Sequence, residues 1–329
     1  MEHGGHKNSS AGCGAGRTYA ELKIERIAAM KKLNITWEGI EDPTGYLFSF
    51  AKSLAAVVKN SPYADLFEDI IATSGFAFRM WVDGGGLCPS ATSIWSFGDQ
   101  KRWVENGGLL CGYVERMWGE DAVEKERRDE AIAMIKESID SGVGVVAWDI
   151  SGCEWGVVTG YNDEEAILYT LKINGNEDKV SYENLGKMEI PILSVLAVRG
   201  KVDRPQEETA EGMLAIARAH LNGEEWCDNA KGFAAYEALI SFIKEKLTDD
   251  MWNLEYYLGT YAGLKLYALK YFEKYGMAEW AEKYRIVYGE WKAAFELKRT
   301  KNAGEEAVRA ELAAHLERAC EAERAAFAK

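Results

Sequence analysis

The sequence predicts an α+β protein in which a sheet-forming half is followed by an all-α half. Between Val143 and Leu171, three apolar and largely β-branched runs are separated by Ser-Gly and Asn-Asp, residue types that favour turns. Beyond Gln206 the composition shifts to Ala, Glu, Lys, Leu and Tyr, which favours helices. The stretch from Gly200 to Pro205 breaks the pattern between the two halves. We therefore divide the chain into a flexible tail (1–17), an α+β domain (18–203) and a domain of about five helices (204–329).

The first part of the chain predicts a tail and three helices. Residues 1–17 are rich in Gly and Ser and lack an apolar period, which is typical of a flexible tail. An apolar stripe predicts a helix from Thr18 to Lys32, with two lysines at its negative end. A second helix is predicted over Leu47–Val58 and ends before Pro62, and Tyr63–Ile71 predicts a short amphipathic helix.

The next part predicts the sheet. Asp121–Asp140 has the spacing of a helix that precedes the strands, with Gly142 after its end. The three apolar runs predict an antiparallel meander, and Ile192–Arg199 predicts one more strand. The meander strands are expected at Val145–Ile150, Trp155–Tyr161 and Ala166–Leu171.

The last part predicts a helical domain that is rich in Tyr and Trp. Aromatic stripes on helices are usually core, although the Tyr hydroxyls then need partners. An alternative is an interaction module that uses these helices to form a homo-oligomer. The five helices are expected near Glu208–Leu221, Asn229–Leu247, Asp250–Tyr275, Met277–Lys298 and Gly304–Phe327.

Composition excludes several classes of protein. The 329 residues are 47% hydrophobic, which is typical of a globular protein with a sizeable core. A net charge of −14 disfavours nucleic acid as a partner, because the phosphate backbone would be repelled. No apolar run approaches the roughly 20 residues of a membrane span, and no signal peptide is visible, so we expect a cytoplasmic protein and no membrane partner. The six cysteines form no C-x-x-C pair, and we expect them to be reduced thiols.

Three stretches carry a resemblance to a known family. The first is the strand that ends in Gly160-Tyr161-Asn162-Asp163, the second is Gly75–Arg79 followed by Cys88-Pro89-Ser90, and the third is the helix start at Gly232–Glu237. They resemble the butirosin biosynthesis protein H-like N-terminal domain family. That family is related to the bacteriocin-processing cysteine peptidases, and the resemblance extends over most of residues 40–300. It implies a papain-like fold for the sheet-forming domain.

The same resemblance implies that the catalytic pair of the family is absent. The nucleophilic Cys would lie at the start of the helix Leu47–Val58, among Ser49 to Ser53, but no Cys occurs between Gly14 and Leu87. The position of the catalytic His, six residues before Gly160, is held by Glu154. A serine hydroxyl could replace the thiol only with a base beside it.

We therefore expect a catalytically degenerate protein that binds a small molecule or a peptide in the former active-site cleft. Glu154, beside two Trp residues, could be an acid with a raised pKa or could receive a cationic ligand; the alternative is an exposed turn residue. We expect no catalytic residues, no cofactor and no metal, although His3, His6 and Cys13 of the tail could in principle hold one. The residues predicted to converge on the ligand site are Ser49, Ser53, Cys88, Trp148, Glu154, Trp155 and Asn162.

A rival hypothesis is an active acyltransferase or amide hydrolase. It would use Cys88 or Cys153 as the nucleophile, with Glu154 or His220 as the base. His220 lies near the end of a predicted helix, beside Gly223, and we expect its ring to face solvent. A free Cys is commonly a small buried hydrophobe and becomes reactive only beside a cationic neighbour.

Overall fold

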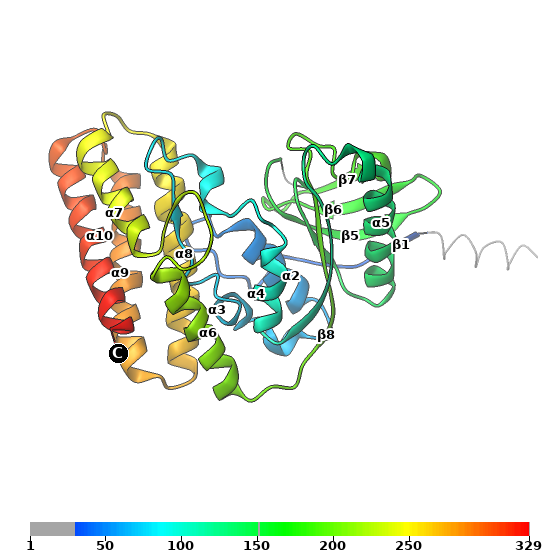
Figure 1. Cartoon of the computed structure of the whole chain (residues 1–329), viewed down its shortest axis with the longest axis horizontal. Coiled ribbons are helices and arrows are strands. Elements are labelled where there is room, and N and C mark those ends of the chain that lie inside the picture. Colours follow the sequence, from blue (N-terminus) through cyan, green and yellow to red (C-terminus); the bar gives the residue numbers. More distant parts are fainter. Residues whose placement is uncertain (1–29, 151, 329) are drawn as a thin grey trace, which may run out of the picture.

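The computed structural model of the chain describes residues 30–150 and 152–328. It is an α+β protein with one large antiparallel sheet and a group of C-terminal helices at the opposite end of the molecule (Figure 1). Helices from the first half of the chain lie between these two parts. Among the described residues, no helix combines the length and the apolarity that crossing a membrane would require.

The sheet has seven strands in the order β3-β8-β4-β5-β6-β7, and every pairing is antiparallel. The seventh strand, β1, pairs with the same strand as β4, beyond the point where β4 ends. β4 pairs with Gly156–Val158 of β5, and β1 pairs with Gly160–Asn162 of β5. The predicted meander corresponds to β4, β5 and β6. The strands are β1 (Met30–Lys32), β3 (Leu109–Arg116), β4 (Val145–Ala147), β5 (Gly156–Asn162), β6 (Ile167–Leu171), β7 (Glu177–Ser181) and β8 (Leu193–Lys201).

Side chains alternate between the two faces of the sheet, as the two-residue period of a strand requires. Val145 and Ala147 of β4 pack with α5 (Glu124–Asp140), whereas Val146 between them belongs to the core that contains α2 (Ser49–Lys59). The sheet is therefore covered on both faces. Both of these helices were predicted from their apolar spacing.

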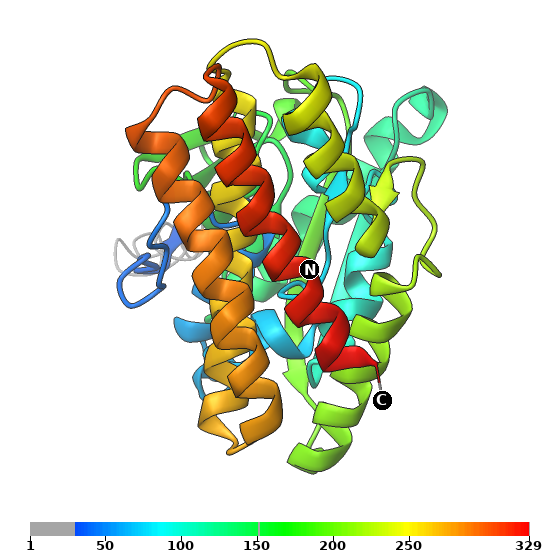
Figure 2. The ribbon, with the colours of Figure 1, turned by 90° about the vertical axis from the view of Figure 1, so that its left-hand side faces the viewer.

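The C-terminal helices pack side by side, with α9 lying between α8 and α10 along much of its length (Figure 2). They follow the predicted ranges closely, except that the predicted helix Asn229–Leu247 is divided into a short strand, α7 and a turn of π-helix over Phe242–Lys246. The helices are α6 (Gln206–Leu221), α7 (Phe233–Ser241), α8 (Trp252–Lys274), α9 (Ala278–Thr300) and α10 (Glu306–Phe327).

A charged pair lies buried inside this helical part. Lys265 Nζ of α8 and Glu323 Oε1 of α10 are 2.7 Å apart, and both side chains are fully buried. The hydroxyls of Tyr236 and Tyr284 each donate to the same carboxylate over 2.7 Å. The Tyr hydroxyls that a buried aromatic stripe must satisfy therefore find a partner here.

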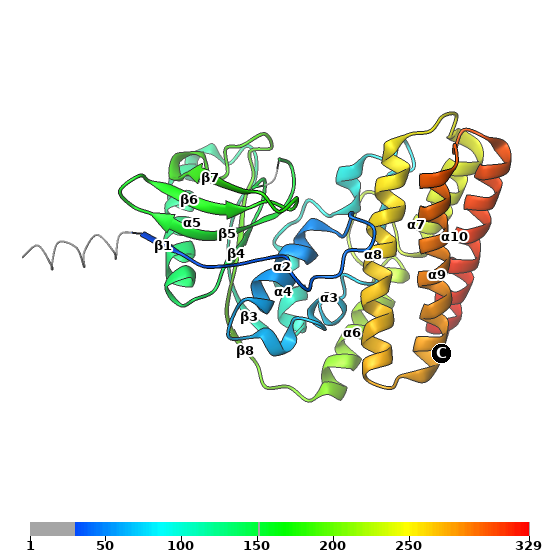
Figure 3. The ribbon, with the colours of Figure 1, turned by 180° about the vertical axis from the view of Figure 1, so that it is seen from behind.

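The two halves of the chain are joined by contacts that cross the predicted domain boundary. A two-stranded ladder pairs β2 (Trp81–Val82) with β9 (Ala230–Lys231), and one continuous hydrophobic core extends from Ile35 to Phe327. Segment 33–48 runs from the sheet across to α8 (Figure 3), where Thr44 Oγ1 donates to the carbonyl oxygen of Gly259 over 2.9 Å. The boundary near residue 203 stays a prediction.

Several local predictions need correction. Met30–Lys32 is an edge strand and not the end of a helix, because its backbone completes the ladder of β5. The predicted helix Tyr63–Ile71 is broken into a 3-10 turn at Ala64–Leu66 and the short α3 (Ile70–Thr73). Three further elements, β3, β7 and α4 (Asp99–Asn106), were not predicted from the sequence. The predicted tail and the predicted helix before Met30 lie outside the described residues.

Candidate functional site

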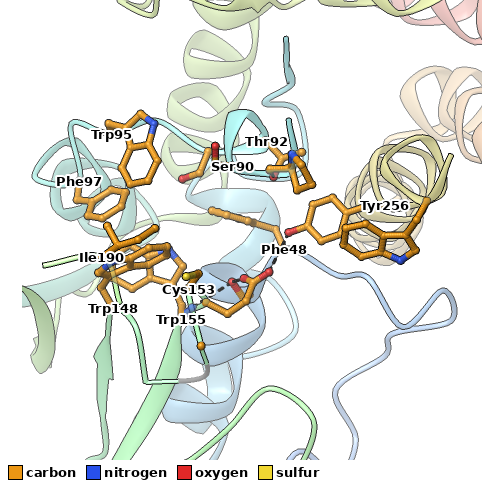
Figure 4. Close-up of a pocket in the computed structure, with 16 residues that line it drawn as sticks. Phe48, Ser90, Thr92, Trp95, Phe97, Trp148, Cys153, Trp155, Ile190 and Tyr256 are labelled. Atoms are coloured by element: carbon orange, nitrogen blue, oxygen red, sulfur yellow. Dashed lines mark hydrogen bonds between the residues drawn. The ribbon is translucent and has the colours of Figure 1, made fainter. Parts of the chain in front are cut away.

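A cavity of about 180 Å³ opens where the sheet, the start of α2 and the start of α8 meet (Figure 4). Its floor comes from the loop between β4 and β5, and one wall comes from the turn at Pro89–Thr92. The cavity therefore draws on both halves of the chain. The aromatic residues that line it are Phe48, Trp95, Phe97, Trp148, Trp155, Trp252 and Tyr256.

Ser49 and Glu154 meet at the bottom of this cavity. Ser49 is the first residue of α2, and its hydroxyl donates a hydrogen bond to Glu154 Oε2. The backbone N–H of Trp155 donates to Ser49 Oγ over 3.3 Å, and the hydroxyl of Tyr256 donates to Glu154 Oε1 over 3.1 Å. Residues 105 positions apart in the sequence thus form one polar cluster at the amino end of α2, where the helix dipole favours negative charge.

Burial controls the protonation of this cluster. It raises the pKa of the Glu154 carboxyl, and the hydrogen bonds from Ser49 and Tyr256 oppose that shift because they stabilise the charged form. Burial and the neighbouring carboxylate together raise the pKa of the Tyr256 phenol well above its usual value. Tyr256 therefore stays a hydrogen-bond donor at neutral pH.

The aromatic walls pack against one another at the distances of favourable ring pairs. The ring centroids of Trp148 and Trp155 are 5.2 Å apart, and Phe97 lies 5.1 Å from the first and 4.8 Å from the second. Trp95 extends this wall at 5.6 Å from Phe97, and Tyr256 lies on the opposite side of the cavity (Figure 4). The shape of the cavity is thus set by rigid rings.

Two indole N–H groups in these walls have no hydrogen-bond partner among the described residues. They belong to Trp148, whose side chain is 8% exposed, and Trp155, which is 1% exposed. A buried donor without an acceptor costs free energy, so such groups are uncommon in a closed core. Both nitrogen atoms are themselves buried, although other atoms of the two side chains line the cavity.

The structure brings together four of the seven residues that the sequence predicted for the ligand site. Ser49, Trp148, Glu154 and Trp155 line the cavity. The alternative of an exposed turn residue is wrong for Glu154, whose carboxylate is held by two hydroxyls.

The other three predicted residues do not line the cavity. Ser53 lies one turn further along α2 and is fully buried, with no partner for its hydroxyl among the described residues. Cys88 precedes the lining residue Pro89, but its exposed thiol contacts the hydroxyl of Ser90 at 3.0 Å. Asn162 is the last residue of β5, at the opposite end of that strand from Trp155. Its side-chain oxygen accepts hydrogen bonds from the backbone of the following turn.

The thiols and histidines do not form a catalytic pair in the described residues. Cys153 lines the cavity, but burial and the charge of Asp149 raise the pKa of its thiol to about 11. His220 is fully buried and does not face solvent as expected, because its Nδ1 bonds Glu225 at 2.7 Å and its Nε2 accepts from the backbone N–H of Met80. Burial lowers the pKa of His220, and the ring is therefore neutral.

Comparisons with protein-family models and with curated proteins find no match for this chain. The described residues also contain no group of three or more His, Cys, Asp or Glu side chains that could hold a metal ion.

Sequence reasoning missed the part of the site that α8 contributes. Tyr256 and Trp252 are two of many aromatic residues in the helical half, and nothing in their spacing distinguishes them from core positions. Trp95 and Phe97 lie in a stretch without a clear period. The sequence pointed to the site only through the family resemblance, which singled out residues near the start of α2 and near Glu154.

Proposed function

We propose that this protein is a catalytically degenerate member of the papain-like group that binds a small molecule or a peptide in the former active-site cleft. The observation that carries the proposal is the hydrogen bond between Ser49 and Glu154. In the family that the sequence resembles, the catalytic His would occupy the position of Glu154, and the nucleophilic Cys would occupy one of the positions from Ser49 to Ser53. The packing of α2 against β4 and β5 is consistent with the same arrangement.

The chemistry of the pair supports binding over thiol catalysis. A papain-like mechanism needs a thiolate and an imidazole that moves its proton. Here the thiol in the cavity, Cys153, has a pKa of about 11, and the buried imidazole of His220 is held by Glu225 and the backbone of Met80. The same walls have the properties of a ligand site, because they are apolar and aromatic with a few convergent polar groups.

Thermal unfolding in the presence of small ligands tests the proposal. The set contains organic cations, organic anions and neutral ring compounds, and each is compared between the natural protein and Ser90→Trp, which places a large ring at the exposed side of the cavity. Ser141→Trp, at the exposed end of α5, is the matched control. We expect at least one class to raise Tm in the natural protein and in the control but not in Ser90→Trp. If no class of compound raises Tm more in the natural protein than in Ser90→Trp, the proposal is overturned.

One observation favours a second candidate function, which is hydrolysis of an ester or amide by Ser49. Its hydroxyl already donates to a carboxylate whose pKa is raised, and that carboxylate could accept the proton as Oγ attacks a carbonyl carbon. Glu154 would pass this proton to the leaving alcohol or amine as the ester or amide bond breaks, and water would then hydrolyse the acyl group from Ser49. A fluorophosphonate probe distinguishes the two functions. Labelling that is lost in Ser49→Ala would favour the hydrolase, whereas a binding protein should not be labelled.

A further inference from the structure

The walls of the cavity restrict which small molecules it can hold. Trp95, Trp148 and Trp155 line one side, and Tyr256 lies on the other side (Figure 4). Because Trp155 is 1% exposed and Trp148 is 8% exposed, the ring surface open to a ligand on these two sides comes mainly from Trp95 and Tyr256. The face of an aromatic ring carries partial negative charge and attracts cations, most strongly when the ring belongs to Trp. Trp252, whose side chain is 53% exposed, adds another ring at the opening.

The charge of the site has the same sign as the ring faces. Glu154 contributes a carboxylate, and none of the described residues that line the cavity is basic. Within the described part of the chain, Glu154 takes part in no ion pair. The whole protein carries a net charge of −14, which further concentrates cations near its surface. A cationic ligand would therefore supply the positive counter-charge that the buried carboxylate lacks.

The hydrogen-bonding capacity of the site selects among cations. Each oxygen of Glu154 already accepts one hydrogen bond, from Ser49 and from Tyr256. The carboxylate keeps one free lone pair on each oxygen, so it can accept from two of the three N–H donors of a primary ammonium, and the third donor would need a hydroxyl of Ser90, Thr92 or Ser93. A methylated ammonium has few or no N–H donors, and its methyl groups fit against aromatic faces.

The size of the cavity agrees with a group of this kind. Its volume is about 180 Å³, and an apolar cavity of about 150 Å³ is large enough to bind benzene. One compact cation fits, whereas an extended chain would reach out through the opening.

We propose that the cavity binds the methylated ammonium group of an organic cation, with Glu154 as its counter-ion and the Trp and Tyr rings as its walls. This inference rests on the proposed function and names the chemical class of its ligand.

Three probes that share a hydroxyethyl group test this inference by titration calorimetry. Choline carries a trimethylated ammonium, ethanolamine replaces it by a primary ammonium, and 3,3-dimethyl-1-butanol replaces the charged nitrogen of choline by carbon. We expect choline to bind at least roughly tenfold more tightly than either of the other two. Equal binding of the neutral alcohol would show that shape alone is recognised, and tighter binding of ethanolamine would show a site for primary amines. Either result overturns the inference.

Two variants locate the interaction. Glu154→Gln keeps the shape and the acceptor oxygen but removes the charge, and we expect it to weaken choline binding by roughly tenfold. Glu317→Gln removes the same charge from the exposed face of α10 and should leave the affinity unchanged. Equal losses in both variants would mean that only the overall field of the protein attracts the cation.

The outcomes separate this inference from the proposed function. If anions or neutral compounds bind in the cleft and choline does not, the inference fails and the proposed function stands. If no class of compound distinguishes the natural protein from Ser90→Trp, both fail.

Discussion

Replacement of Lys265 by Met tests the buried charged pair in the helical part. The substitution keeps most of the side-chain volume but leaves the carboxylate of Glu323 without its cation, in a position where both side chains are fully buried. Loss of one partner from a buried pair costs about 3–5 kcal/mol. The hydroxyls of Tyr236 and Tyr284 still donate to the carboxylate, so we expect the lower end of this range, about 3 kcal/mol.

Urea unfolding measures this change as a shift of the midpoint. A loss of about 3 kcal/mol corresponds to a midpoint lower by about 1 M urea for a chain of this size. Lys244→Met is the control, because Lys244 pairs with Glu317 at the surface and such pairs contribute about 0–1 kcal/mol. The double variant Lys265→Met with Glu323→Gln removes both charges and should recover more than half of the loss. Equal midpoints for Lys265→Met and Lys244→Met would refute the reasoning.

Four further predictions follow from particular groups. The affinity for choline should weaken as the pH falls through the raised pKa of Glu154, because protonation removes the counter-ion; calorimetry between pH 8 and pH 4 checks this, and a flat profile contradicts it. Alkylation of Cys153 by iodoacetamide should increase about tenfold per pH unit from pH 7 to pH 9, since its thiol pKa is about 11; mass spectrometry that finds a plateau in this range would exclude that pKa. Gly160→Ala should cost about 1–3 kcal/mol in urea unfolding, because its Cβ would lie 2.7 Å from Lys32 Cα of β1; an unchanged midpoint would count against this register. Burial opposes ionisation of Glu225, yet the hydrogen bond from His220 and the charge of Arg79 lower its pKa to about 2, below the unfolded value of about 4.3. The free energy of unfolding should therefore fall as the pH drops from about 5 toward 2, and the fall should be smaller in Glu225→Gln.

The helices were the most predictable part of the fold. An apolar stripe identified α2, and Pro62 explains why it ends soon after Val58. The meander was equally visible, because turn residues separate its apolar runs. By contrast, β7 lies at an edge of the sheet with most of its residues exposed, so it carries no apolar period. β3 mixes charged and apolar residues and contains Gly112, which weakens a strand pattern.

The site was predictable only where a resemblance supplied the pairing of distant residues. Periodicity alone cannot show that Ser49 meets Glu154, because this contact depends on how α2 packs on the sheet. It also cannot show that Tyr256 reaches the same carboxylate from the helical half. His220 illustrates the opposite error. Its place near a helix end suggested exposure, whereas contacts with Met80 and Glu225 bury it completely.

The hydrogen bond from Tyr256 to Glu154 crosses the seam between the sheet and α8. A ligand that binds between these two side chains contacts both the sheet and α8. Its binding free energy therefore also opposes separation of the sheet from α8. Occupancy could then be followed at a distance, as slower hydrogen exchange in the β2–β9 ladder, where the two halves of the chain share backbone hydrogen bonds.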